Sequence, residues 1–365
     1  MARRILLFVT DLEIGGTPTV VRDLAVRLTE IDGLEIDVAC LARWGPVAEE
    51  LRAAGIAVYA LAAGSVWDVT AVARFIGLVR RRGYDTVFSF LVHANAVAAI
   101  GTRFATYRLI QSIQTTQSRP RWHWWVQRRV SGRAEKIVTP SPSAARVARE
   151  RCAIEADKVV VIPNAVDVAA FEPSPIPIQQ PAPVPYPIGF IGRLDPIKRI
   201  PNLVRSLLAV KQPVHLHIFG EGPERAEISA AITRYGVEPR VTLHGAIRRP
   251  QEALAQVGLL VLPSAAEGFG LVLIEAMAAR VPVVATDVPG IRDVVRDGVN
   301  GLLAGLDDEQ ALAGAIDCTV GNSEFRHGLI ERAYESVKER FTWQRILPMY
   351  RELLQLDPAP APSAW

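Results

Sequence analysis

The chain has 365 residues, of which 50% are hydrophobic and 22% are charged, so it is expected to be globular, with apolar material for two domains. Its three cysteines, Cys40, Cys152 and Cys318, are far apart and form neither a disulfide framework nor a zinc-binding spacing, which fits a reducing compartment. Residues 1–166 carry 22 Lys and Arg against 15 Asp and Glu, whereas residues 167–365 carry 19 against 23. A basic first half favours an anionic partner there, such as a membrane surface or a phosphorylated acceptor.

The chain begins with an apolar run at residues 5–9 that is too short for a signal peptide and is predicted to be the first strand. A loop to Gly16 follows, and a helix with an apolar stripe from Val20 to Leu28 comes next. Backbone N–H groups at Gly16 are placed to contact a phosphate, although a glycine pair at a strand–helix junction is also ordinary turn composition. No apolar run approaches the roughly 20 residues of a membrane span.

Short apolar runs and helical patterns alternate along the rest of the chain, which predicts an α/β protein with doubly wound parallel sheets. Seven prolines between residues 172 and 187 indicate an extended linker and a domain boundary. The predicted strands are residues 35–41, 57–61, 85–90, 136–139 and 158–162 in the first half, and 188–191, 215–219, 241–244, 257–262 and 282–285 in the second. A loop at residues 290–293 is expected to open a helix, and the Pro/Ala-rich tail 357–365 is expected to be disordered.

A histidine lies just past the end of the predicted strand 85–90. His93 and Asn95 occupy the position where ligands of parallel α/β folds bind. The alternative is a helix cap or a hydrogen-bonded core group, which is the commoner role of such a residue.

Residues 119–133 combine five arginines with three of the seven tryptophans of the chain. Trp favours the level of lipid headgroups and Arg pairs with anionic lipid, so we expect this segment to dock on a membrane surface. The alternatives are a Trp-rich packing face with a solvated basic edge, or RNA binding, which no nucleic-acid motif supports. The side chains expected at the membrane or the acceptor are Arg121, Trp122, Trp124, Trp125, Arg128 and Arg129.

The second half restarts with a strand followed by Gly192 and Arg193, with Lys198 five residues further on. Arg and Lys on one turn can converge on one anion, because Arg forks onto phosphate oxygens and Lys supplies a point charge. Surface charge on a loop is the alternative interpretation.

Two carboxylates, Glu267 and Glu275, bracket a glycine turn and lie eight residues apart. An apolar strand precedes this turn and a helix follows it, so free N–H groups and the positive end of a helix dipole converge where a phosphate can bind. Each carboxylate accepts hydroxyl hydrogen bonds, which suits a polyhydroxylated ligand. The residues of the turn are Gly268, Phe269, Gly270 and Leu271.

The sequence Glu267-Gly268-Phe269-Gly270, followed by Glu275, resembles the E-x7-E motif of the retaining glycosyltransferases of family 4. The resemblance implies the GT-B fold, with two Rossmann-like domains facing across a cleft. It implies an acceptor-binding domain at 1–168, a linker at 169–187, a nucleotide-sugar-binding domain at 188–341, and a helix at 342–356 that crosses back to the first domain.

In that family Arg193 and Lys198 would neutralise the diphosphate leaving group. Glu275 would hold ribose hydroxyls and Glu267 sugar hydroxyls. The loop at Gly16 would close on the diphosphate from the opposite domain, although Thr17-Pro18 departs from the family pattern by lacking an acidic residue.

The loop at His93 resembles that of bacterial members that extend lipid-linked oligosaccharides, where it faces the transferred sugar. We therefore expect a retaining, metal-independent glycosyltransferase without a cofactor. It would use a UDP- or GDP-sugar and a lipid-linked or polysaccharide acceptor, from the cytoplasmic face of the plasma (inner) membrane. A non-catalytic glycan or sugar-nucleotide scaffold and a GT-B sugar-nucleotide epimerase remain alternatives.

Overall fold

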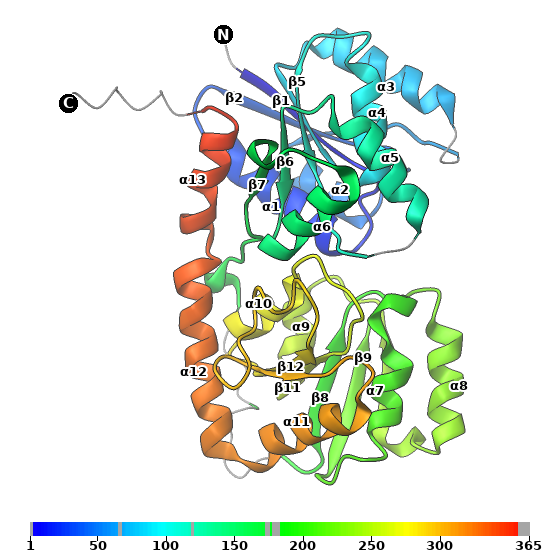
Figure 1. Ribbon diagram of the computed structural model, residues 1–365, viewed down its shortest axis with the longest axis vertical. Helices are drawn as coiled ribbons and strands as arrows, with labels where there is room; N and C mark the ends of the chain where they lie inside the picture. Colours follow the sequence, from blue (N-terminus) through cyan, green and yellow to red (C-terminus); the bar gives the residue numbers. More distant parts are fainter. Residues whose placement is uncertain (1–2, 65–67, 118–119, 172–175, 177–182, 357–365) are drawn as a thin grey trace, which may run out of the picture. The chain divides into compact units, whose positions relative to one another are not determined.

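The computed structural model describes residues 3–64, 68–117, 120–171, 176 and 183–356. The chain divides into two compact units, Met1–Asn164 with Gln344–Trp365, and Ala165–Trp343 (Figure 1). The tail expected to be disordered and most of the Pro-rich linker lie outside the described residues.

The first unit is built on a seven-stranded parallel sheet in the order β3-β2-β1-β4-β5-β6-β7. Its central strands are buried apolar runs, as expected of a parallel sheet covered by helices. The strands are β1 (Arg3–Val9), β2 (Leu34–Cys40), β3 (Ala57–Ala60), β4 (Thr86–Phe90), β5 (Arg108–Ser112), β6 (Lys136–Thr139) and β7 (Val159–Val161).

Helices connect these strands, and α3, α4, α5 and α6 pack side by side in chain order. The helices are α1 (Gly16–Thr29), α2 (Pro46–Ala53), α3 (Val69–Arg82), α4 (Val92–Gly101), α5 (Arg121–Ser131), α6 (Pro142–Cys152) and α13 (Trp343–Leu353). The last of these packs on the first unit, as expected. The Tyr350 ring lies 6.2 Å from that of Phe88, and Arg108 donates to the Leu353 carbonyl at 2.8 Å.

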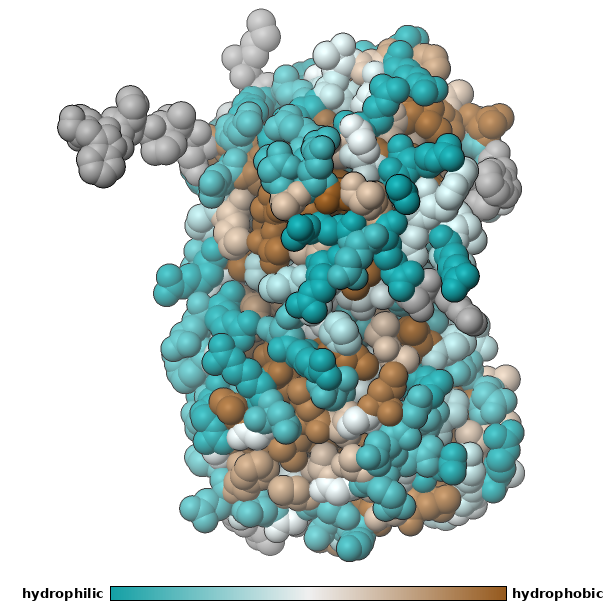
Figure 2. All heavy atoms as spheres, viewed as in Figure 1, coloured by the Kyte–Doolittle hydropathy of each residue, from teal (hydrophilic) through white to brown (hydrophobic). Residues whose placement is uncertain are grey.

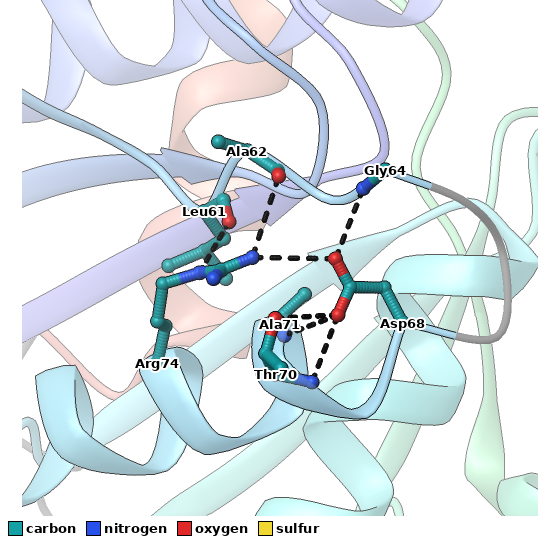
Figure 3. Close-up of polar contacts among 7 residues, drawn as sticks. All are labelled: Leu61, Ala62, Gly64, Asp68, Thr70, Ala71 and Arg74. Atoms are coloured by element: carbon teal, nitrogen blue, oxygen red, sulfur yellow. Dashed lines mark hydrogen bonds and ion pairs between the residues drawn. The ribbon is translucent and has the colours of Figure 1, made fainter.

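The start of α3 is held by one carboxylate (Figure 3). Asp68 accepts hydrogen bonds from the backbone N–H groups of Thr70, Ala71 and Gly64 at 2.9, 3.3 and 3.0 Å. Arg74, one turn into the helix, pairs with the same carboxylate at 3.4 Å and also donates to the Leu61 carbonyl. The cap supplies acceptors for the first helical N–H groups. The Thr70 hydroxyl also donates to Asp68, and this bond first, then the backbone N–H bonds, lowers the pKa of Asp68 because they favour the ionised carboxylate.

The second unit repeats the plan with six parallel strands in the order β10-β9-β8-β11-β12-β13. The strands are β8 (Tyr186–Ile191), β9 (Val214–Phe219), β10 (Val241–Gly245), β11 (Leu259–Leu262), β12 (Val283–Thr286) and β13 (Leu302–Ala304). The helices are α7 (Ile200–Ser206), α8 (Arg225–Tyr235), α9 (Pro250–Leu254), α10 (Leu271–Ala278), α11 (Glu309–Gly321) and α12 (Ser323–Arg340).

Both sheets reverse their strand order beside the first strand, between β1 and β4 and between β8 and β11. Loops that leave the carboxyl ends of these strand pairs diverge, and ligands of doubly wound folds bind in the crevice they leave. The predicted fold class is confirmed. One local expectation is wrong: residues 289–294 form turns, and no helix opens there. The strands β5 and β13 were not anticipated.

Candidate active site

In the second unit, the loops after β8 and β11 meet at the point where the strand order reverses. Gly192 donates its N–H to the Phe219 carbonyl at 3.0 Å, which ties the end of β8 to the end of β9. Gly220 has φ 146°, and a Cβ there would lie 1.9 Å from the Gly192 oxygen, so only glycine permits this approach. Gly220 thus permits the close packing of the strand ends, and Gly192 takes part through its backbone.

The ion pair between Lys198 and Glu267 joins the two loops. The Lys198 Nζ lies 2.5 Å from the Glu267 Oε1, which also accepts a bond from the Ser264 hydroxyl at 2.7 Å. Alongside, Ala265 donates its N–H to the Ile197 carbonyl at 2.8 Å. The Lys and Glu side chains are 21% and 13% exposed, so both remain within reach of a ligand.

The backbone behind Glu267 is fixed by the elements on its other side. Thr286, the last residue of β12, donates its hydroxyl to the Ser264 carbonyl. Gly290 has φ 85°, and a Cβ on it would lie 2.2 Å from the Glu267 carbonyl oxygen. Sequence reasoning missed Ser264, Thr286 and Gly290 as supports, and the one available signal was the isolated Gly290 in a loop.

Gly270 forms the N-cap of α10 with φ 82°, and it provides no side chain to bind the first helical N–H groups. Phe269 is 3% exposed and meets Phe341 edge-on at 5.3 Å between ring centroids, so its side chain packs in the core. Glu275 is 8% exposed in a helix that is otherwise apolar. A carboxylate in such a place requires polar partners, and Glu275 has at least one polar interaction within the chain.

Arg193 differs from these residues, since its side chain is 66% exposed and pairs with Asp195 at the long distance of 3.8 Å. The geometry brings Lys198 and Glu267 together but leaves Arg193 at the surface of the same loop. Arg199, next to Lys198, has φ 55° and pairs with Asp307 on the turn before α11, which anchors the end of the loop.

In the first unit, Gly16 opens α1, and its N-cap residue Gly15 offers no side-chain hydrogen bond to the helix. His93 lies in the first turn of α4, behind Leu91, which has φ 71° in a region that non-glycine residues seldom adopt. Burial lowers the pKa of His93, and the nearby Asp11 carboxylate offsets part of that effect.

The six side chains expected at a membrane or an acceptor do not all face outward. Trp122 and Trp125 are 44% and 59% exposed, and the Arg129 guanidinium lies 4.7 Å from the Trp125 ring centroid. Arg121 and Arg128 are exposed as well. Trp124 is instead 7% exposed and donates its indole N–H to the Gln117 carbonyl at 2.7 Å, so the expectation for this residue is corrected.

The part of the chain that the structure describes contains no helix long and apolar enough to cross a membrane. On the face in Figure 2, hydrophobic residues appear as separate patches between hydrophilic ones. No group of three or more His, Cys, Asp or Glu side chains among the described residues is arranged to hold a metal ion.

Two doubly wound units, each built on a parallel sheet, define the GT-B fold class. Residues 14–170 match the family described as Glycosyltransferase Family 4, and residues 185–322 match that described as Glycosyl transferases group 1. Together the two matches span most of the chain, which therefore belongs to this family of glycosyltransferases.

The chain is 33% identical over 165 residues to the N-acetyl-alpha-D-glucosaminyl L-malate synthase of Bacillus anthracis, covering 45% of this chain and 43% of that protein. It is 31% identical over 261 residues to the D-inositol 3-phosphate glycosyltransferase of Xylanimonas cellulosilytica, covering 64% and 62%. The chain thus spans about half the length of the curated relatives it matches.

The fold is also that of Anabaena Alr3699/HepE, solved in complex with UDP-glucose. That structure superposes with a TM-score of 0.87 at 23% identity, over 97% of this chain and 100% of that one.

Proposed function

We propose that the protein transfers a sugar from a UDP- or GDP-sugar to a glycan acceptor. The observation that carries this proposal is the meeting of Lys198 and Glu267 at the strand-order reversal of the second unit. A diphosphate bound there gains the Lys198 ammonium and the backbone N–H groups at the start of α10. Glu267 then holds sugar hydroxyls and Glu275 holds the ribose.

The chemistry requires a place for the negative charge that grows on the diphosphate as the anomeric bond breaks. Lys198 is already positioned by Glu267, so little rearrangement is needed when that charge appears. Arg193, being exposed and weakly paired, is the residue that can swing onto the diphosphate. We propose a retaining, front-face transfer that needs no metal ion, in which the leaving phosphate accepts the proton of the acceptor hydroxyl.

The first unit is proposed to bind the acceptor and to dock on a membrane. Residues 69–152, which include α3 to α6, hold 15 Lys and Arg and three Asp and Glu. Trp125 and Arg129 stack together on the exposed side of α5, a combination suited to anionic headgroups. We place the protein on the cytoplasmic face of the plasma (inner) membrane, with a lipid-linked glycan as acceptor.

The curated relatives support an acceptor of this kind. One is named as a lipopolysaccharide core biosynthesis glycosyltransferase of Rhizobium meliloti, and another as a poly(ribitol-phosphate) alpha-N-acetylglucosaminyltransferase of Staphylococcus aureus. Both names describe transfer to a large envelope polymer or glycolipid.

A thermal-shift panel of UDP- and GDP-sugars tests the donor. A ligand at about 100 times its Kd stabilises the folded protein by about 2.7 kcal/mol, which gives a clear rise in Tm. One nucleotide sugar is expected to raise Tm and to be turned over equally well with EDTA. No shift with any donor contradicts the proposal, and strict dependence on added Mn²⁺ contradicts its metal-free form.

Two further measurements test its finer points. A retaining transfer gives a product whose anomeric configuration, read by NMR, matches that of the donor; the opposite configuration contradicts it.

Sedimentation of the protein with anionic vesicles is expected to exceed that with neutral vesicles and to fall with salt. Equal sedimentation with both vesicle types contradicts membrane docking.

A further inference from the structure

Three rings from two helices gather at the carboxyl edge of the sheet in the first unit. The ring centroid of His93, on α4, lies 5.6 Å from that of Trp122 and 5.3 Å from that of His123, both on α5. The Trp122 and His123 rings meet edge-on at 4.1 Å. Since Trp122 is 44% exposed, part of its indole remains open as a platform beside two imidazoles.

Two buried polar atoms on the adjacent strand ends have no hydrogen-bond partner among the described residues. They are the Nε2 of His93, which follows β4, and the Oγ1 of Thr10, which follows β1. β1 and β4 are paired neighbours, with Val9 opposite Phe90, so both atoms belong to the same edge of the sheet. Buried polar atoms normally have hydrogen-bond partners. The absence of partners for these two atoms points to a ligand that supplies them.

A buried polar network fixes the two helices that carry the rings. Asn95 of α4 donates to the Gln127 side chain of α5 at 2.9 Å and accepts from Ser89 of β4 at 2.7 Å. Gln127 donates in turn to Gln111 of β5 at 2.9 Å. Asn95 is 0% exposed and Gln127 is 3% exposed. Hydrogen bonds of this kind in a dry interior hold side chains in one arrangement, so the ring cluster is prepared before any ligand arrives.

The charge of the cluster favours a neutral ligand. Burial lowers the pKa of both His93 and His123, so the neutral imidazoles are favoured at neutral pH. The carboxylate of Asp11 acts on His93 and is negatively charged. Such a place repels phosphate, whereas neutral imidazoles and a threonine hydroxyl both donate and accept hydrogen bonds with sugar hydroxyls. Arg121, exposed and next to Trp122 in sequence, is the nearest cation along the chain.

We infer that Trp122, His123, His93 and Thr10 form a subsite for the terminal sugar ring of the acceptor. The C–H face of a pyranose stacks on the open indole of Trp122, and its hydroxyls bond to the imidazoles and to the Thr10 hydroxyl. This inference rests on the proposed function and adds to it the class of acceptor group: a neutral sugar ring instead of a phosphate. It assigns His93 to the acceptor sugar, whereas the family resemblance implied that this loop faces the transferred sugar.

The test measures binding of neutral methyl glycosides of glucose, galactose, mannose and N-acetylglucosamine to the full chain, by saturation-transfer NMR and titration. These probes carry no lipid, so membrane docking does not contribute. At least one is expected to bind with its ring C–H protons saturated, and Trp122→Ala is expected to raise its Kd by about tenfold, the loss of one aromatic contact. Trp44→Ala, which changes another exposed tryptophan of the first unit (50% against 44% for Trp122), is the matched control and is expected to change the Kd less than twofold.

Each contrary outcome overturns the inference. The first is that no glycoside binds the wild-type chain, and the second is that Trp122→Ala binds glycosides as tightly as the wild type. The third is that glycerol phosphate competes for the site with higher affinity than the glycosides and that Arg121→Gln abolishes this competition. Trp122→Phe, which keeps an aromatic ring, is expected to restore most of the affinity and guards against a misfolded alanine variant.

The donor experiment separates this test from the proposed function. Trp122→Ala is expected to keep the full donor-induced rise in Tm, since its change lies in the first unit. If no nucleotide sugar shifts Tm but glycosides still bind, the proposed function is contradicted while the sugar subsite is supported.

Discussion

The two units have the same sheet order around their reversal points but place different chemistry there. The second unit brings a lysine and a carboxylate together across two loops that are packed through glycines. The first unit gathers neutral rings over a network of buried amides. One backbone plan therefore positions a lysine–carboxylate pair in one unit and a cluster of rings in the other, and the loops after the strands determine which.

The largest effect is expected from the charged pair of the second unit. Lys198→Ala removes a preformed cation from the diphosphate, and kcat should fall by about 10²–10³, as for other groups that stabilise developing charge. Lys338→Ala, in an exposed pair with Glu335, is the control and should leave kcat unchanged. If both variants turn over the donor equally fast, Lys198 does not stabilise the leaving diphosphate, and the proposed difference between the two units is contradicted.

The amide network of the first unit is expected to contribute mainly to stability. Gln127→Leu removes one acceptor of the Asn95 amide and the donor to the Gln111 Oε1 in the interior, although both side chains keep other hydrogen bonds. The free energy of unfolding should fall by about 1–3 kcal/mol. Urea unfolding measures this. The exposed Gln344→Leu serves as the control, and a Gln127 variant as stable as that control would show that the network does not fix the helices.

A pair of glycine substitutions sharpens the account of the second unit. Gly290 and Gly298 both have positive φ, but a Cβ on Gly298 meets nothing within 4 Å. Gly298→Ala should cost about 1 kcal/mol for the left-handed backbone alone. Gly290→Ala should cost more and also reduce kcat, because it displaces Glu267. If the two variants match in stability and activity, the contact with Glu267 has no role.

The smallest effect concerns the cap of α3 in the first unit, away from either reversal point. Asp68 has a lowered pKa in the folded state, so its contribution to stability is present above the unfolded pKa of about 3.9 and is lost as pH falls through the folded value. Asp68→Asn should lower Tm at pH 7, and the difference from wild type should shrink below about pH 4. Asp32→Asn, on an exposed turn, should show no such trend. A pH-independent difference would exclude the ionised cap.

Much of the fold could be predicted because the central strands are continuous apolar runs and the turns carry glycines. β5 was missed because Arg108 and Gln111 interrupt its apolar pattern. The Gln111 side chain accepts a hydrogen bond from Gln127 on α5, a contact that the sequence does not reveal. The helix expected after Gly290 does not form, and the Asn300 side chain instead binds the Arg296 N–H and the Val294 carbonyl.

The residues of the candidate site could be predicted from the sequence, but the contacts between them could not. Lys198 and Glu267 are 69 residues apart, so nothing local reveals that they pair. Trp124 and Trp125 are adjacent and chemically alike, yet one lies in the core and the other in solvent. Only the packing of α5 on its neighbours decides which face each tryptophan occupies.

The central claim is that the second unit binds a sugar nucleotide through the loops after β8 and β11. A crystal structure of the full chain with its stabilising donor tests this most directly. We predict the diphosphate within hydrogen-bonding distance of the Lys198 Nζ and the first N–H groups of α10, with the ribose hydroxyls on Glu275. A donor bound elsewhere, with the Lys198–Glu267 pair untouched by any part of it, would contradict the account.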